Sequence, residues 1–277
     1  MTTTFPIIYL ISVPRARSTI LFRALEAQFE AQLQTKSDAH FTCYHEPSQA
    51  IHDKDKEMVR GATYAVDWFR DTAFRSYDEL KQQIFLSSTK GPVLVKEVSF
   101  ACIKCLDDIN FISQPNIFFN FLIRDPLETI ASFYKQVGSN IAEFFKDDIG
   151  YKQLYNLYKR IEHTCPNKPQ IITNEEFRDP YTVISKVLNN SELYYPIQLH
   201  WNNLNTNFDG SSWHEQKKPE LTRYWHGPAI NSTCIMYQES NIKSLDDLLA
   251  VVDPLHREQV TDAYYYNLPF YQEFIKN

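Results

Sequence analysis

Short unbroken apolar runs alternate along the chain with longer segments in which apolar residues recur every three or four positions. An unbroken short run is typical of a β-strand buried on both faces, and the longer spacing is typical of a helix with one buried face. The pattern therefore predicts an α/β fold. Its strands are expected at 5–12, 41–44, 92–98, 117–123 and 170–173.

Helices are expected between these strands. The helix expected at 126–137 has the clearest start, with Asp125 as N-cap, Pro126 in the first helical position and Glu128 in the third, a capping-box arrangement. Strands that alternate with helices predict a parallel sheet of about five strands with helices on both faces, a three-layer sandwich. The other expected helices cover 18–33, 100–110, 151–163 and 253–274.

Two polar stretches interrupt this alternation. Segment 50–87 is rich in Asp, Lys and Arg and is expected to form a helical insertion over one end of the sheet. Segment 202–231 is long, polar and rich in turn residues, which is typical of a functional surface loop. No internal repeat or linker appears, so a single domain over 1–277 is expected to carry both stretches as decorations.

The composition excludes several classes of protein. The chain has 28 Lys and Arg residues against 34 Asp and Glu, a net charge of −6, which disfavours a nucleic-acid binder. Only 6 glycines are present and the first is Gly61, so neither a Rossmann fingerprint nor a Walker A loop can follow the first strand. His45 and His52 have no partner at ligand spacing, and no metal site is expected.

The N-terminal residues and the cysteines indicate in which cellular compartment the protein is expected. The first residues lack the basic and long apolar regions of a secretory signal, and the longest apolar run near them, 7–11, is far too short to span a bilayer. The 5 cysteines form no disulfide framework, and the lone C-x-x-C of Cys102 and Cys105 is interpreted as two thiols on one helix face. A cytoplasmic protein with reduced thiols is expected.

The loop after the first strand has the chemistry of an anion site. It contains Arg15, Ala16 and Arg17 and leads into Ser18 and Thr19 at the start of the helix. The N-terminus of a helix presents free backbone N–H groups and the positive end of its dipole, and arginines and hydroxyls add donors. A phosphate or sulfate group is the expected ligand, and the plainer alternative is that Ser18 only caps the helix.

A second such position follows the fourth expected strand. Arg124 ends this strand, and Ser132 lies eight residues later on the face of the next helix that turns toward Arg124. Taken alone, Arg124 and Asp125 could equally form a well-capped helix with an ion-paired arginine.

The two positions together resemble the signature of sulfotransferases that use 3′-phosphoadenosine 5′-phosphosulfate (PAPS). Their 5′-phosphosulfate loop, Pro-Lys/Arg-Ser-Gly-Thr/Ser-Thr, is similar to Pro14-Arg15-x-x-Ser18-Thr19, in the form found in an atypical bacterial and plant branch. The resemblance covers roughly residues 1–135 and implies a P-loop-like fold, PAPS as co-substrate and a small-molecule acceptor. In it, the loop 15–19 holds the 5′ end of the donor, while Arg124 and Ser132 hold the 3′-phosphate. The loop glycine of the family is absent, and Arg17 stands in its place.

The resemblance also suggests where the catalytic groups lie. A base is needed for the acceptor, and His45-Glu46-Pro47 follows the second strand, with Glu46 the first choice and His45 the second. Lys96 and Glu97 end the third strand, where Lys96 would stabilise the leaving phosphate and Glu97 is an alternative base. The plainer interpretations are a proline turn at Glu46 and a salt bridge at the rim of the sheet.

Later residues are less specific. The resemblance implies a late basic segment that closes the donor site, and the polar loop offers Lys217, Lys218 and Arg223, with Trp213 and Trp225 as stacking residues. Aromatic residues at 64–69 and 264–266 are candidates for an acceptor pocket. Two other interpretations remain open: a nucleotide-dependent phosphotransferase, and a degenerate non-catalytic member that binds a nucleotide or a partner.

Overall fold

The described part of the chain forms a five-stranded, all-parallel sheet with the strand order β2-β3-β1-β4-β5. The computed structural model describes residues 4–33, 40–60, 74–137, 146–193 and 239–276, with isolated positions between 229 and 237. This confirms the expected α/β class and the parallel sheet. The strands are β1 (Ile7–Ser12), β2 (Thr42–His45), β3 (Val93–Val98), β4 (Ile117–Ile123) and β5 (Gln170–Thr173).

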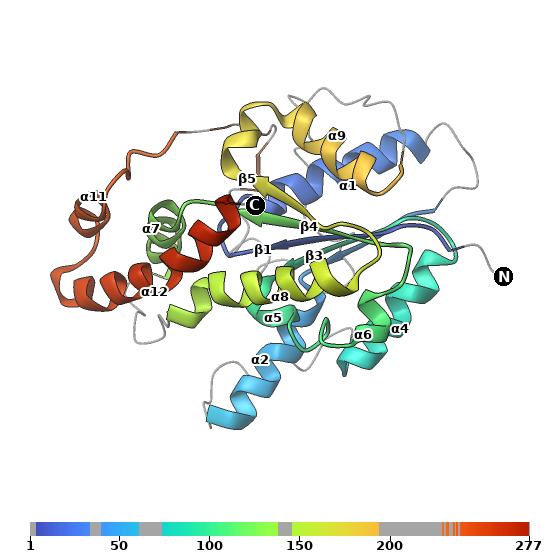
Figure 1. The fold of residues 1–277 in the computed structure, drawn as a ribbon, viewed down its shortest axis with the longest axis horizontal. Coiled ribbons are helices and arrows are strands. Elements are labelled where there is room, and N and C mark those ends of the chain that lie inside the picture. The colour runs from blue at the N-terminus through green and yellow to red at the C-terminus, as the bar shows by residue number, and fades with distance from the viewer. Residues whose placement is uncertain are drawn as a thin grey trace.

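Helices cover both faces of this sheet. Figure 1 shows α1 and α9 on one side, α2, α4, α6 and α8 on the other, and α7, α11 and α12 gathered at one end. These helices are α1 (Ser18–Leu33), α2 (Pro47–Arg60), α4 (Tyr77–Ser88), α5 (Ser99–Cys102), α6 (Ile109–Ile112), α7 (Pro126–Val137), α8 (Tyr151–Thr164), α9 (Pro180–Asn190), α11 (Leu245–Ala250) and α12 (Arg257–Ile275). Short 3₁₀ turns at Lys146–Ile149, Asn174–Arg178 and Pro254–His256 join them. None of the described helices has both the length and the apolar character needed to cross a bilayer.

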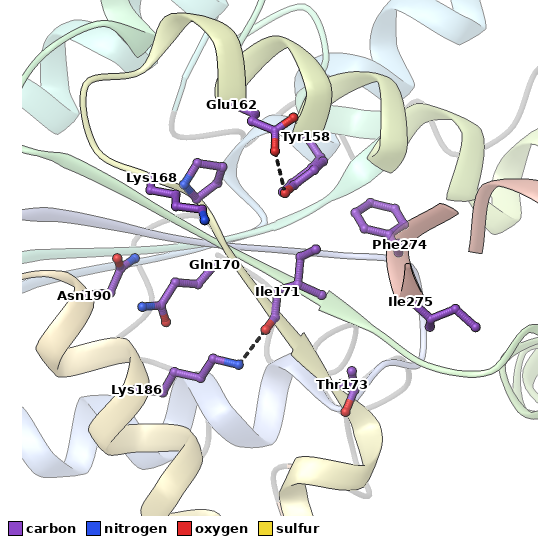
Figure 2. A pocket seen from close by; sticks show the side chains of 11 residues that line it. Tyr158, Glu162, Lys168, Gln170, Ile171, Thr173, Lys186, Asn190, Phe274 and Ile275 are labelled. Atoms are coloured by element: carbon purple, nitrogen blue, oxygen red, sulfur yellow. Dashed lines mark hydrogen bonds between the residues drawn. The ribbon is translucent and has the colours of Figure 1, made fainter. Parts of the chain in front are cut away.

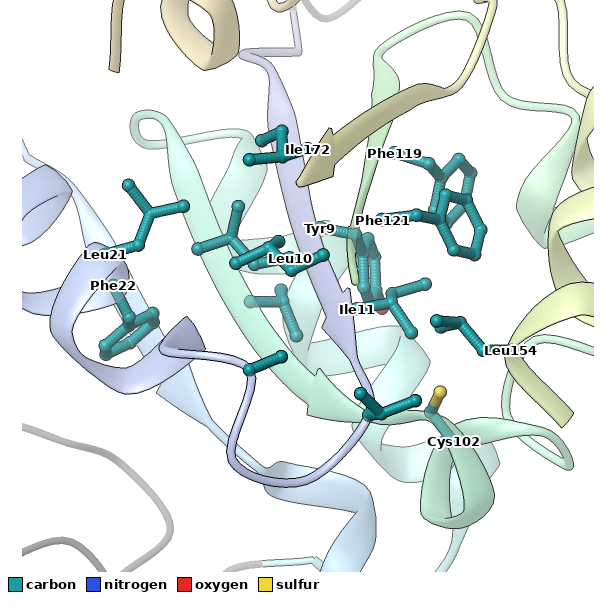
Figure 3. Close-up of a cluster of buried hydrophobic side chains, with 14 of the residues drawn as sticks. Tyr9, Leu10, Ile11, Leu21, Phe22, Cys102, Phe119, Phe121, Leu154 and Ile172 are labelled. Atoms are coloured by element: carbon teal, nitrogen blue, oxygen red, sulfur yellow. The ribbon is translucent and has the colours of Figure 1, made fainter. Parts of the chain in front are cut away.

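The core lies on both sides of β1, whose six residues are all buried. Tyr9 stacks on Phe119 at 5.3 Å between ring centroids (Figure 3). Tyr9 also meets the edge of Phe111 at 6.2 Å. Burial on both faces explains why the strands are continuous apolar runs and why they could be predicted from the sequence.

One predicted helix is wrong. Segment 100–110 is not continuous: α5 ends at Cys102 and α6 begins at Ile109, with a turn between them. The reason lies at Asp108, whose side chain accepts hydrogen bonds from the backbone N–H groups of Asn110 and Phe111 and starts a new helix. The buried Cys105 and Leu106 in the turn kept the apolar pattern going across the break.

The other boundaries differ little from the prediction. The Asp125 carboxylate accepts from the N–H of Leu127 at 2.8 Å, as expected of an N-cap, whereas Glu128 pairs with Arg124. The helical insertion contains α2 and α4, and its middle, 61–73, lies outside the described residues.

The outer edge of the sheet at β5 is closed by side chains. Lys186 donates to the carbonyl of Ile171 at 2.7 Å, and Glu176 accepts from the N–H of Thr173 at 2.8 Å. An edge strand whose backbone groups are partnered in this way is a poor template for another strand.

Parallel register brings the ends of the strands together. Ser12 at the end of β1 pairs with Val98 of β3 and Leu122 of β4, and His45 of β2 pairs with Lys96. The loops that follow β1, β2 and β4 therefore meet at the same edge of the sheet, where ligands of open α/β sheets bind.

Candidate active site

The loop between β1 and α1 lies at this carboxyl edge, as the sequence predicted. Ser12 donates to the hydroxyl of Ser18 at 2.8 Å, which ties the end of the strand to the start of the helix. The next hydroxyl, Thr19 Oγ1, lies 3.5 Å from His45 Nε2 at the end of β2. The N-terminus of the 16-residue helix α1 thus faces the loop after β2 as well as its own.

The backbone of this loop is strained at both arginines. Arg15 and Arg17 each have a φ of 64°, the left-handed region that favours glycine. Such a conformation costs an L-residue on the order of 1–3 kcal/mol and is retained when the surroundings enforce it. Arg17, which stands where the resembled family has glycine, thus adopts a positive φ.

Three guanidinium groups meet here. Arg124 Nη1 donates to the carbonyl of Arg15 at 3.1 Å, and Arg15 Nε donates to Ser132 Oγ at 3.1 Å. Burial, and then the neighbouring charge of Arg124, lower the pKa of both Arg15 and Arg17. Like charges held this close indicate a place for an anion.

The link between Ser132 and Arg15 differs from the expected arrangement. The sequence placed Ser132 with Arg124, because the two lie one after the other on a strand and the next helix. In the structure Arg124 Nε pairs with Glu128 at 2.8 Å, while Ser132 bonds to Arg15. The two anion-binding positions expected from the sequence are therefore adjacent and joined by Arg15.

Two residues that the sequence did not single out lie beside Arg17. The ring of Tyr237 has the Arg17 guanidinium 5.4 Å and the Arg178 guanidinium 4.9 Å from its centroid. Arg178 ends the turn after β5, so its place at the carboxyl edge was open to prediction from strand order. Tyr237 carries no such signal, since it belongs to a segment far along the chain.

Glu46 lies in a strained turn between β2 and α2. Its φ is 52°, its N–H donates to the carbonyl of Lys96 at 2.6 Å, and its carboxylate forms an ion pair with Lys96 Nζ. Burial and the charge of Arg124 lower the pKa of Arg15, and the charge of Glu46 offsets part of that lowering, so the carboxylate lies on the side of the loop. His45 is fully buried and packs edge-on against Phe22 at 5.3 Å.

Lys96 and Glu97 differ although they are neighbours. Successive side chains of a strand point to opposite faces of the sheet, and Lys96 points to the pair with Glu46. Glu97 is 1% exposed and its Oε1 accepts from the N–H of Ser48 at 3.1 Å. Burial raises the pKa of Glu97 to about 8. This burial favours Glu46 over Glu97 as the group that meets an acceptor.

Several candidates fall outside the described residues: the aromatic segment 64–69 and the late residues Trp213, Lys217, Lys218, Arg223 and Trp225. On α12, the rings of Tyr264 and Tyr265 pack together at 5.3 Å, and Tyr265 is 59% exposed. No group of three or more His, Cys, Asp or Glu side chains that could hold a metal occurs within the described ranges.

A cavity of about 640 Å³ lies elsewhere, along the outer side of β5 (Figure 2). Two of its charged residues are paired, Lys186 with Glu176 and Glu162 with Lys159, and Lys168 also lines it. It includes none of the loop arginines, and a second cavity of about 200 Å³ beside α8 includes none either. The loop arginines at the carboxyl edge therefore lie apart from both cavities.

Comparison with known proteins gives similarity of fold at low identity. No family model and no curated protein matches the chain. Among solved structures, it is similar to the sulfotransferase domain of the Synechococcus PCC 7002 olefin synthase, with 12% identity and a TM-score of 0.46 over 91% of this chain and 94% of that one. A sulfotransferase from Alicyclobacillus acidocaldarius gives 12% and 0.44 over 92% and 100%. A retinol dehydratase solved with androsterone and the inactive cofactor PAP gives 13% and 0.44 over 96% and 82%.

Proposed function

We propose that this chain transfers the sulfuryl group of PAPS to a hydroxyl or amine of a small-molecule acceptor. The observation that supports this most is the contact of Arg124, after β4, with the backbone of Arg15, after β1. PAPS carries a 5′-phosphosulfate and a separate 3′-phosphate, so it needs anion-binding groups from two places. A site shared between two neighbouring strand ends suits such a donor.

Each part of the donor has a set of groups suited to it. The 5′-phosphosulfate is held by backbone N–H groups of the loop and of the start of α1, including that of Ala16, and by the hydroxyls of Ser18 and Thr19. The 3′-phosphate is held by Arg124 and Ser132. Arg15, which donates to Ser132, links the two positions.

The transfer step needs a base for the acceptor and a cation for the leaving group. Glu46 takes the proton of the acceptor hydroxyl or amine while the acceptor oxygen or nitrogen attacks sulfur in line. The bond from sulfur to the bridging oxygen of the 5′-phosphate breaks, and its electron pair stays with that phosphate, giving adenosine 3′,5′-bisphosphate. Lys96 neutralises the charge that develops there. The resting ion pair of Glu46 with Lys96 keeps both groups at the same place.

Thermal unfolding with candidate ligands tests the donor site first. A ligand that binds only the folded state adds RT ln(1 + [L]/Kd), about 2.7 kcal/mol at a hundredfold excess over Kd. We expect adenosine 3′,5′-bisphosphate to raise the melting temperature equally with and without magnesium, and ADP and GDP to raise it little. A rise seen only with magnesium-bound diphosphates would instead support a phosphotransferase.

Turnover is a separate test. Purified protein with PAPS and a panel of phenols, alcohols and amines should release adenosine 3′,5′-bisphosphate in amounts equal to the sulfated product. Binding of the bisphosphate without release, across the whole panel, would favour a non-catalytic binding protein.

A further inference from the structure

The turn that carries Glu46 is held by hydrogen bonds to two neighbouring residues of β3, Lys96 and Glu97. On one side, Lys96 binds the N–H of Glu46 through its carbonyl, at 2.6 Å, and the carboxylate through its ammonium. On the other side, Glu97 Oε1 accepts from the N–H of Ser48 at 3.1 Å. Two consecutive residues of β3 therefore hold the turn at two points, two residues apart.

This turn needs to be held. The φ of 52° at Glu46 is unfavourable for an L-residue, and Pro47 then begins α2 with a fixed φ. Within the turn, the N–H of Gln49 donates to the carbonyl of Glu46 at 3.0 Å. The first N–H groups of a helix have no partner inside it, so the Glu97 carboxyl supplies one for α2 and fixes where this 14-residue helix starts.

We propose that Glu97 is a positioning residue, whose buried carboxyl holds the first turn of α2 and thereby keeps Glu46 in the left-handed conformation that presents it to Lys96 and the loop. This inference rests on the proposed role of Glu46 as the base. Glu97 itself touches neither donor nor acceptor, since it lies on the other face of the sheet.

The carboxyl of Glu97 is buried and has few charged neighbours. Its Oε2 is buried and has no hydrogen-bond partner in the described part of the chain. The titratable and charged groups that face it are Glu46 and Lys96 beside it, Tyr9 on β1, Tyr77 on α4, Cys102 on α5 and Cys105 in the following turn.

A distinct pH signature follows from these neighbours. Burial raises the pKa of Glu97 to about 8, and it raises the pKa of Tyr9, Cys102 and Cys105 well above their ordinary values. Among these four groups, Glu97 is therefore the one expected to titrate near pH 8. The negative charge formed there acts through the sheet on Lys96 and offsets part of its positive charge, so the rate should fall as the pH rises through this step.

Two variants separate the roles of shape and charge. Glu97→Gln keeps an oxygen acceptor for the N–H of Ser48 but cannot ionise. Glu97→Leu removes the acceptor. With Glu97→Gln we expect kcat at pH 7 within about threefold of the wild type and no fall near pH 8. With Glu97→Leu we expect kcat to fall about tenfold or more, while KM for PAPS and the Kd for adenosine 3′,5′-bisphosphate stay within about threefold.

A readout that needs no activity accompanies these. Amide hydrogen exchange at Glu46, Ser48 and Gln49 should be at least about tenfold faster in Glu97→Leu than in the wild type, with β1 and β4 unchanged. Glu97→Gln should exchange like the wild type. Wild-type kcat and exchange in Glu97→Leu, or an unaltered pH profile in Glu97→Gln, would overturn the positioning role. If the exchange changes as expected but the wild type neither binds the bisphosphate nor transfers sulfuryl groups, the proposed function fails and the positioning role stands.

Discussion

The strained backbone at Arg17 allows a stringent test, because two substitutions at this position differ only in their effect on φ. Arg17→Gly and Arg17→Ala both remove the guanidinium and its contact with Tyr237. Glycine adopts the observed φ of 64° without steric cost, whereas alanine retains the Cβ that makes this region unfavourable. The difference in stability between the two variants therefore measures the strain at this residue.

The expected magnitude follows from two opposing terms. A left-handed φ costs an L-residue roughly 1–2 kcal/mol. A glycine variant is less stable than an alanine variant by about 0.4–1 kcal/mol on other grounds, because glycine makes the unfolded chain more flexible. Arg17→Gly should thus be more stable than Arg17→Ala by roughly 0.5–1 kcal/mol. Loss of the contact with Tyr237 lowers the unfolding free energy of both variants by ~0.5–1 kcal/mol relative to the wild type.

Urea unfolding of the three proteins measures this order, and calorimetric titration with adenosine 3′,5′-bisphosphate measures the loss of the charge. Both variants should bind about tenfold or more weakly than the wild type, because each lacks a charged donor. If Arg17→Ala is as stable as Arg17→Gly, the loop does not hold Arg17 in a strained conformation. If Arg17→Gly binds like the wild type, close approach of the backbone matters there and the guanidinium does not.

Three further predictions follow from the same contacts. Arg124→Ala should weaken binding of adenosine 3′,5′-bisphosphate more than tenfold in calorimetry, since it removes a charge-assisted contact. The control Arg160→Ala breaks a surface ion pair with Asp107 and should leave binding unchanged. Equal effects of the two substitutions would contradict the anion site. The difference in unfolding free energy between the wild type and Glu97→Gln should fall as the pH rises from about 4.5 to about 8 and level off above. The reason is that the folded state holds the Glu97 proton over that interval while the unfolded state has lost it. A difference that does not change with pH would refute the raised pKa of Glu97. Lys186→Ala should lower stability by about 1 kcal/mol and promote association seen by light scattering, because it removes the partner of the Ile171 carbonyl on the edge strand; bisphosphate binding should not change.

Much of the fold could be predicted because its strands are buried on both faces. For β4, the unbroken apolar run gave both boundaries, and the start of α7 could be located from Asp125 and Pro126. The break at 103–108 was missed, since buried residues of the turn continue the apolar spacing of a helix. Asp108 was the available signal, as an N-cap residue within an expected helix.

The site was predictable to the extent that strand ends meet. Arg15 and Arg124 follow strands that turned out to be neighbours, so their contact needed only the strand order. The partner of Ser132 was beyond reach, because its rotation on α7 relative to the loop depends on packing. Tyr237 was beyond reach for a related reason: the contact joins segments more than two hundred residues apart in sequence.

The location of the strain supports the same site from another direction. Glu192 is one of four described non-glycine residues with a positive φ, and it lies just beyond the end of α9, where the N–H of Leu193 bonds to the carbonyl of Leu188 at 3.0 Å in the usual way of a helix C-terminus. The other three, Arg15, Arg17 and Glu46, end no helix. They lie at the carboxyl edge of the sheet, where guanidinium groups also repel one another. Backbone strain and charge repulsion both lower the stability of the folded protein. A bound anion relieves the repulsion between the guanidinium groups, and it binds to the loop conformation that the strained residues maintain. The stabilisation by adenosine 3′,5′-bisphosphate, whose two phosphates lie at different positions, should therefore exceed that by a nucleoside or by inorganic sulfate alone.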